Sequence, residues 1–284
     1  MIKTDIPAPL INWPELLRLS RLHMSENKSE KGVMWDHAAD MYNKMAAMER
    51  EYTIAQLDAF DTSPEDTVLD VGCGPGRISV PMAQRAKSVT AIDNAEKMLH
   101  YCKENARKAG VQNLTALLLD WKNAVLGENL EKHDIVIASR SEGMKDIEKL
   151  TSFARKYAVM IAWANSPCIP DILGDLFYGT SAYKKRGSPG QRDRRLGYNI
   201  FYNMVYDLGY DPNIKIVTDG FTKDYADYEE AYDDLRTLGK IEDDEMEVFR
   251  NNCNRWLSEN EKGGITFRRE TKSFVLWWSP EKRF

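Results

Sequence analysis

Two patterns of hydrophobic and polar residues divide the chain near residue 64. Before it, apolar residues recur at the spacing of an amphipathic helix, at Trp35, Ala38, Ala39, Tyr42, Met45 and Ala46. After it, short and nearly continuous apolar runs alternate with segments of helical period. Such runs are typical of strands covered on both faces, so the pattern predicts a parallel sheet flanked by helices.

These runs also place the expected elements. Strands are expected at 67–71, 88–92, 114–119, 133–138, 158–163 and 215–218, with closing strands at 266–269 and 272–278. Helices are expected at 35–60, 78–86, 95–109, 144–156, 171–178 and 198–208, after a short helix that begins at Pro14. Residues 221–262 are rich in Asp, Glu and Tyr and are interpreted as helices inserted into the sheet topology.

The domain organisation follows from this order of elements. Residues 1–63 are expected to form an N-terminal helical extension, and residues 64–284 an α/β domain that contains a helical insertion at about 164–262. Residues 25–32 are polar and are interpreted as a link. The stretch 184–195 is rich in Lys and Arg, and is either a solvated loop or a surface for an anionic substrate or RNA.

Composition narrows the class of protein. The chain has 284 residues, 43% hydrophobic and 29% charged, with a net charge of -5, which is ordinary for a soluble globular protein. The negative balance argues against nucleic acid as a partner, and no apolar run approaches the roughly 20 residues of a membrane span. The four cysteines are far apart and the N-terminus lacks a signal peptide, so a cytoplasmic protein with reduced thiols is expected.

The strongest motif is the stretch from Val68 to Arg77, in which an apolar strand runs into three alternate glycines. Without side chains, Gly72, Gly74 and Gly76 allow a ligand to approach the backbone closely. Asp70 precedes the first glycine by two positions, and the glycine spacing differs from that of the fingerprint for nicotinamide dinucleotides.

Two further acidic positions follow neighbouring strands. Asp93 ends the second strand, where a carboxylate can accept hydrogen bonds from both hydroxyls of a ribose, or can cap the next helix. Asp120 and Trp121 end the third strand, where they can bind and cover an adenine ring, or form a surface turn. All three loops are expected at the carboxyl edge of one sheet, where open α/β folds bind ligands.

Over residues 65–165 the sequence resembles class I S-adenosylmethionine (SAM) dependent methyltransferases, whose first motif is D/E-x-G-x-G-x-G. The resemblance implies a Rossmann-like, seven-stranded, mostly parallel sheet, with SAM as cofactor and S-adenosylhomocysteine as product. It further implies that an aromatic residue of the N-terminal helix closes over SAM, although packing alone explains these residues equally well. The residues it assigns to the cofactor are Asp70, Gly72, Cys73, Gly74, Gly76, Asp93, Asn94, Met98, Asp120, Trp121, Ser139, Trp35 and Tyr42.

The sequence does not identify the methyl acceptor. A helical insertion near the last strands favours a small-molecule acceptor, and the alternatives are RNA, protein, or SAM binding without turnover. Arg77 is either a solvated residue or a contact to the SAM carboxylate, and Arg140 can pair with Glu142 at the surface. No catalytic residue is nominated, no metal-ligand spacing is present among the histidines, and the oligomeric state is left open.

Overall fold

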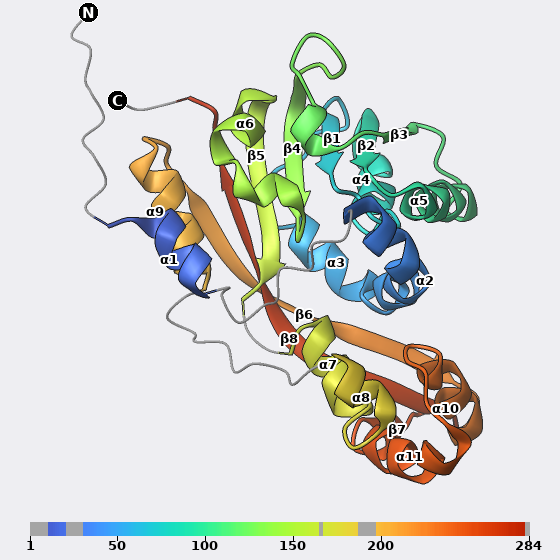
Figure 1. Cartoon of the computed structure of the whole chain (residues 1–284). Coiled ribbons are helices and arrows are strands. Elements are labelled where there is room, and N and C mark those ends of the chain that lie inside the picture. Colours follow the sequence, from blue (N-terminus) through green and yellow to red (C-terminus); the bar gives the residue numbers. More distant parts are fainter. Residues whose placement is uncertain (1–10, 21–30, 165–166, 187–196, 282–284) are drawn as a thin grey trace, which may run out of the picture.

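The computed structural model describes residues 11–20, 31–164, 167–186 and 197–281 (Figure 1). The described residues form an eight-stranded sheet in the order β3-β2-β1-β4-β5-β8-β6, with β7 paired to β8. Strands β1 to β5 are parallel, and β8 is antiparallel to its neighbours. The bounds are β1 (Thr67–Val71), β2 (Ser88–Asp93), β3 (Leu114–Leu118), β4 (His133–Ser139), β5 (Ala154–Trp163), β6 (Asn213–Tyr225), β7 (Leu257–Glu259) and β8 (Ile265–Trp278). The predicted α/β class and mostly parallel sheet are confirmed, and β7 is the strand beyond the expected seven.

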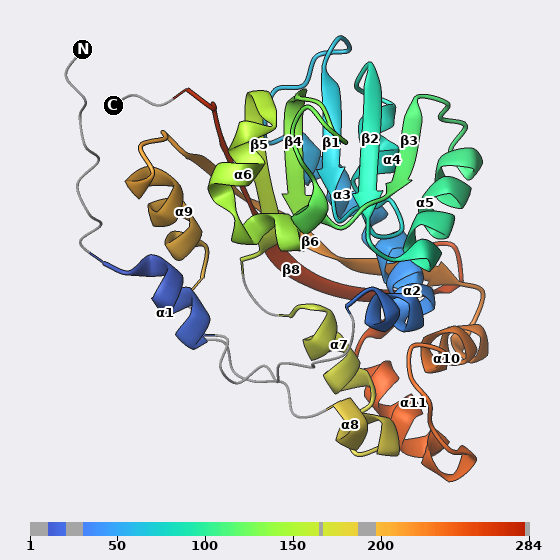
Figure 2. The same ribbon diagram turned by 45° about the horizontal axis from the view of Figure 1, so that its top comes forward.

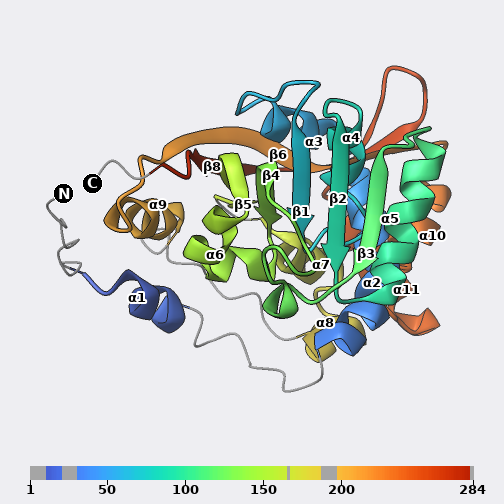
Figure 3. The same cartoon turned by 90° about the horizontal axis from the view of Figure 1, so that it is seen from above.

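Helices cover both faces of the parallel strands (Figure 3). Successive side chains of a strand point to opposite faces, so Val68 of β1 packs with α3 (Arg50–Leu57) and α4 (Ser79–Ala83). Its neighbour Leu69 belongs instead to the hydrophobic cluster of the other face, which also contains residues of α6 (Ile147–Ser152) and α9 (Tyr198–Asp207). Helix α5 (Glu96–Lys108) lies over β2 through Leu99 and Cys102. Two hydrophobic layers therefore fix the sheet between its helices.

A second, helical lobe lies beyond the carboxyl ends of the parallel strands (Figure 2). It contains α7 (Ile169–Leu176), α8 (Ser181–Arg186), α10 (Tyr228–Arg236), α11 (Met246–Asn254) and β7. Its core includes Phe177 and Phe249, which stack with ring centroids 5.3 Å apart. We refer to these elements as the helical lobe. They confirm a helical insertion before the last long strand, within which 213–225 is a strand and not a helix.

The lobe is attached through the long strands β6 and β8. Residues 213–218 of β6 pair with β8 beside β5, whereas residues 219–225 pair with 265–271 beyond the end of β5. We call the second half, 219–225 with 265–271, the ribbon. The predicted helix over 221–225 was therefore wrong, and the two predicted closing strands are one strand. Charged side chains such as Lys223 are tolerated there because β6 is an edge strand with one face in solvent.

The N-terminal helices divide between two places. Helix α1 (Trp13–Ser20) packs on α9, where the Trp13 Nε1 donates to Asp207 at 2.8 Å. The helix expected at 35–60 is instead two helices, α2 (Lys31–Met48) and α3, separated at Glu49. The expected link at 25–32 lies outside the described residues up to 30, as does the basic stretch from 187 to 195.

Among the described residues, none of the helices is both long enough and apolar enough to cross a membrane.

Candidate functional site

The glycine loop between β1 and α4 has a backbone that only glycine adopts without strain. Gly72, Gly74 and Gly76 have φ of 70°, 54° and 87°. A Cβ on Gly72 would lie 2.5 Å from the Cβ of Ser141, so the loop after β4 packs directly on it. At Gly74 the same atom would meet only the Met98 Sδ, at 4.0 Å. The backbone at Gly74 is therefore open on the side that a ligand would approach.

Asp93 is joined to this loop. One carboxylate oxygen accepts from the Gly74 N–H at 2.9 Å and the other from the Ala95 N–H at 3.0 Å. Burial raises the pKa of this carboxyl, while these N–H groups oppose the rise. Ala95 is the N-cap of α5, so neither Asp93 nor Asn94 has that role. Each oxygen keeps a lone pair, which leaves Asp93 able to accept from hydroxyl groups of a ligand.

Asp120 and Trp121 follow the neighbouring strand β3. Asp120 caps a short 3₁₀-helix, η1 (Trp121–Asn123), by accepting from the Lys122 N–H at 2.9 Å. The Trp121 ring is buried, with its centroid 5.1 Å from that of Phe153 in the core below α6. Asp120 thus lies at the expected edge, whereas the indole packs inward; the adenine contact of both residues stays a prediction.

Helix α2 crosses the start of α5 beside the glycine loop. Trp35 and Tyr42 meet edge to face with ring centroids 5.2 Å apart, and both pack with Ala39, Ala95 and Met98. At the same crossing the Lys97 N–H donates to Asp36 at 2.8 Å, and Tyr101 donates to Asp40 at 2.6 Å. The predicted residues Trp35, Tyr42 and Met98 are therefore brought together.

Asp70 is the last residue but one of β1 and is buried. Ser79 donates to one carboxylate oxygen at 2.5 Å, while the other, Oδ1, has no hydrogen-bond partner among the described residues. Burial raises the pKa of Asp70 from its usual 3.8 to about 6. A buried acceptor without a donor, two residues before the glycines, marks the loop as a place for a ligand donor.

Cys73 of the same loop is buried beside Cys102 of α5. Its contact with Cys102, together with burial, raises the pKa of the Cys73 thiol well above its usual value. A neutral thiol is a poor nucleophile, so Cys73 serves as a packing residue of the loop.

Arg77 and Arg140 are placed differently from the expectation. Arg77 is a buried residue, not a solvated one: its guanidinium donates to Ser139 Oγ at 2.5 Å and to Gln56 at 2.8 Å. Arg140 pairs with Glu49 and Asp219, whereas Glu142 pairs with Lys145. The predicted Arg140–Glu142 pair was therefore wrong.

Sequence reasoning missed Glu49 and Asp219 as members of the site. Glu49 gave no signal in the sequence, because the helical pattern of 35–60 runs through it; its burial and the break between α2 and α3 are seen only in the structure. Asp219 gave no signal either, because it stands among other acidic residues. Within the described part of the chain, no group of three or more His, Cys, Asp or Glu residues could hold a metal ion.

Comparison with known proteins identifies a family for the part of the chain that carries this edge. Residues 62–161 match the family model described as Methyltransferase domain. An uncharacterized protein of Haemophilus influenzae is 25% identical over 282 residues, 96% of this chain and 98% of that protein. A probable cobalt-precorrin-6B C(15)-methyltransferase (decarboxylating) of Methanococcus maripaludis is 28% identical over 144 residues, 51% of this chain and 80% of that protein.

One further likeness is shorter, and another concerns the fold alone. The 23S rRNA (uracil(1939)-C(5))-methyltransferase RlmD of Marinomonas is 33% identical over 92 residues, 32% of this chain; the chain spans only 21% of that protein. A solved structure described as "Conversion of a Disulfide Bond into a Thioacetal Group during Echinomycin Biosynthesis" has a TM-score of 0.52 and 13% identity, covering 88% of this chain and 92% of that one. The latter likeness shows the fold alone.

Proposed function

The chain carries a class I SAM-dependent methyltransferase domain, and from this premise we propose that it transfers a methyl group from SAM to a small-molecule acceptor. The observation that carries the proposal is the position of the helical lobe. The glycine loop, Asp93 and Asp120 follow β1, β2 and β3 at one edge of the sheet, and the lobe lies beyond that same edge (Figure 2). An acceptor held between them is of limited size.

The residues of this edge fit SAM on two counts. The backbone at Gly74 is open, since a side chain there would meet only Met98, and a nucleoside needs such an approach. The Asp70 Oδ1 is a buried acceptor that has no donor among the described residues, which suits an ammonium or hydroxyl group. When bound, SAM supplies a methyl group on a positively charged sulfur and becomes the thioether S-adenosylhomocysteine.

The chain's own residues have three tasks in this proposal. Asp93 accepts from the ribose hydroxyls while it holds the Gly74 N–H, so ligand and loop share one anchor. Asp120 is the candidate acceptor for the adenine amino group, and Trp35 and Tyr42 cover the ligand from α2. Transfer then needs an in-line approach, and orientation alone supplies much of the rate. A base is needed only for an acceptor that arrives protonated.

The relatives favour a small acceptor over RNA. The likeness to the precorrin methyltransferase extends over 80% of that protein, whereas that to RlmD stops at 21%. RlmD thus shares only the domain that any SAM-dependent enzyme of this class needs. RNA is kept as the second candidate because RlmD is nonetheless 33% identical over the shared 92 residues.

The proposal is tested by transfer of a labelled methyl group. SAM labelled in the methyl group is incubated with the full chain and, separately, with a small-molecule extract, total RNA and total protein. We expect label in the extract fraction, and much less transfer by the Asp93→Ala variant at SAM concentrations near the Kd of the wild type. Label in RNA alone would replace the first candidate with the second, and label in protein alone would contradict both.

A further inference from the structure

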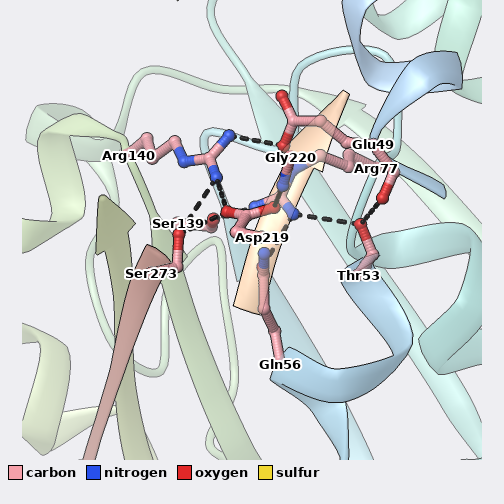
Figure 4. Close-up of polar contacts among 9 residues, drawn as sticks. All are labelled: Glu49, Thr53, Gln56, Arg77, Ser139, Arg140, Asp219, Gly220 and Ser273. Carbon is pink, nitrogen blue, oxygen red and sulfur yellow. Dashed lines mark hydrogen bonds and ion pairs between the residues drawn. The ribbon is translucent and has the colours of Figure 1, made fainter. Parts of the chain in front are cut away.

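Four charged side chains form a buried cluster beside the glycine loop (Figure 4). Arg140 donates to Glu49 Oε2 at 2.6 Å and to Asp219 Oδ2 at 2.7 Å, and Arg77 Nε lies 3.5 Å from the same Glu49 oxygen. The exposed fractions of these side chains are 13% or less. We call Glu49, Arg77, Arg140 and Asp219 the charge cluster.

Each member of the charge cluster comes from a different part of the fold. Glu49 stands between α2 and α3, and Arg77 follows the glycine loop directly. Arg140 follows β4, and Asp219 is the first residue of the ribbon that leads to the helical lobe. Ser273 of β8 donates to Asp219 and accepts from Arg140, which ties in the second strand of the ribbon. The cluster therefore joins the donor side of the site to the acceptor side.

Stability does not account for this arrangement. Buried charges lose their favourable hydration energy, and their mutual attraction often does not compensate for that loss. Proteins in which apolar residues of similar size replace such charges are commonly as stable. The Arg140 Nε has no hydrogen-bond partner among the described residues. Arg140 also has a φ of 54°, the only positive φ of a non-glycine residue in the described part of the chain. A strained backbone conformation persists only where the surrounding structure enforces it, and such residues are concentrated at functional sites.

The ring of Trp163 holds Arg140 from the remaining side. The guanidinium carbon lies 3.7 Å from the ring centroid, at the end of β5. Arg140 is thus held by a carboxylate of the N-terminal helices, a carboxylate of the ribbon and an aromatic face of the sheet. A side chain fixed from three elements transmits their relative positions, because none can shift without breaking a contact.

We propose that Arg140, Glu49 and Asp219 are positioning residues that fix the glycine loop relative to the helical lobe. The inference rests on the proposed function, because the glycine loop holds the donor and the lobe bounds the acceptor. An in-line displacement loses about a hundredfold in rate when a reacting group is misplaced by an ångström. Breaking the cluster therefore lowers turnover and leaves SAM affinity nearly unchanged, because neither Arg140 nor Asp219 belongs to the glycine loop or to the assigned SAM contacts.

The test uses Asp219→Asn, which keeps the size of the side chain and an oxygen for Ser273 but removes the charge facing Arg140. The matched control is Asp134→Asn. Asp134 lies at the end of β4 away from Arg140, and its Oδ1 pairs with Arg155 Nε at 2.8 Å, so this variant also removes the carboxylate of an ion pair. For each protein, SAM affinity is measured by calorimetry. Amide exchange of residues 219–225 is measured with and without saturating SAM, and kcat with the extract fraction that accepts label.

In the wild type and in Asp134→Asn, SAM should slow amide exchange of residues 219–225. In Asp219→Asn the slowing should be lost and kcat should fall by at least about tenfold, while the Kd for SAM stays within about threefold. Slowing and kcat that match the wild type would overturn the inference, as would a wild type in which SAM leaves 219–225 unaffected. Failure of the wild type to bind SAM would instead contradict the proposed function.

Arg140→Lys is a second variant for the case in which Asp219→Asn fails to fold. It keeps the positive charge but lacks the fork that reaches Glu49 and Asp219 together. The same loss of slowing and the same fall in kcat are expected. Wild-type behaviour of Arg140→Lys would contradict the inference.

Discussion

At the scale of single residues, Asp93 combines two functions in one carboxylate. It ends β2, where the sequence predicts a ribose acceptor, and it also holds the glycine loop through the Gly74 N–H. The second function is a contact between residues 19 positions apart, which depends on β1 and β2 lying side by side. A ligand bound to Asp93 is therefore placed directly against the loop.

Asp70 provides a prediction about pH. Its pKa is about 6 in the folded chain against 3.8 otherwise, so the folded state binds more protons between about pH 4 and 6. Its contribution to the free energy of unfolding is therefore present below about pH 4 and is lost as the pH rises through 6. Asp70→Asn cannot ionise, so its free energy of unfolding should decline less over this range, as measured by urea unfolding at pH 4, 5, 6 and 7.

Asp134→Asn is the control for this measurement. Arg155 holds the pKa of Asp134 well below its usual value, so this group stays charged throughout pH 4 to 6 in the folded chain. Its removal should leave the slope over that range close to that of the wild type. Identical slopes for Asp70→Asn and the wild type would contradict the buried, proton-binding state of Asp70.

Gly72 provides a prediction for which Gly110 serves as the control position. Gly72 and Gly110 share a φ of 70°, but a Cβ would strike Ser141 only at Gly72, and at Gly110 it would meet nothing within 4 Å. Gly110→Ala should cost about 1–2 kcal/mol of unfolding free energy from the backbone alone. Gly72→Ala should cost more and should also weaken SAM binding, as measured by urea unfolding and calorimetry. Equal losses in the two variants would show that the contact with Ser141 is unimportant.

The sequence could predict the local half of the site. The glycine loop and Asp93 are recognisable because a strand end and the residues after it are adjacent in the chain. The charge cluster was not predictable, because Glu49 and Asp219 lie 91 and 79 positions from Arg140. Only the folded sheet brings them together, and one isolated acidic residue resembles another in the sequence.

At the scale of elements, α2 connects the sheet domain to the helical lobe. Its Trp35 and Tyr42 pack beside Met98, and its Met45 and Met48 belong to the core of the lobe. Lys44 of the same helix pairs with Asp234 of α10 at 3.2 Å. The closing of this helix over SAM stays a prediction.

If α2 covers bound SAM, then SAM should slow amide exchange along residues 35–48. Exchange of α1 serves as the internal control, because α1 packs on α9. Equal exchange of α2 with and without saturating SAM would contradict its function as a lid.

The ribbon shows where the prediction of elements failed, and why. Residues 221–225 carry Lys223 and Asp224 beside Phe221 and Tyr225, and the charges suggested a helix. In the structure Phe221 and Tyr225 are buried in the lobe, whereas Lys223 on the same face of β6 stays exposed and pairs with Asp234. Buried residues four positions apart, with charged residues between them, match the period of a helix as well as that of a strand.

At the scale of the whole molecule, the chain is a methyltransferase sheet domain with a helical lobe carried on two extended strands. The alternation of strands and helices from residue 67 onward made the sheet domain predictable. The lobe was predictable only as a helical insertion, because its position depends on β6 and β8 continuing past the sheet. That position is what supports a small-molecule acceptor.

The central claim is that SAM binds at the glycine loop with its ribose on Asp93. Calorimetric titration of the wild type and of Asp93→Ala with SAM tests it most directly, with Asp134→Asn as control. We predict saturable binding by the wild type and the control, and a loss of about 1.5–3 kcal/mol in Asp93→Ala, because hydrogen bonds to a charged group are removed. Absence of binding at millimolar SAM, or equal affinity of Asp93→Ala and the wild type, would contradict the account.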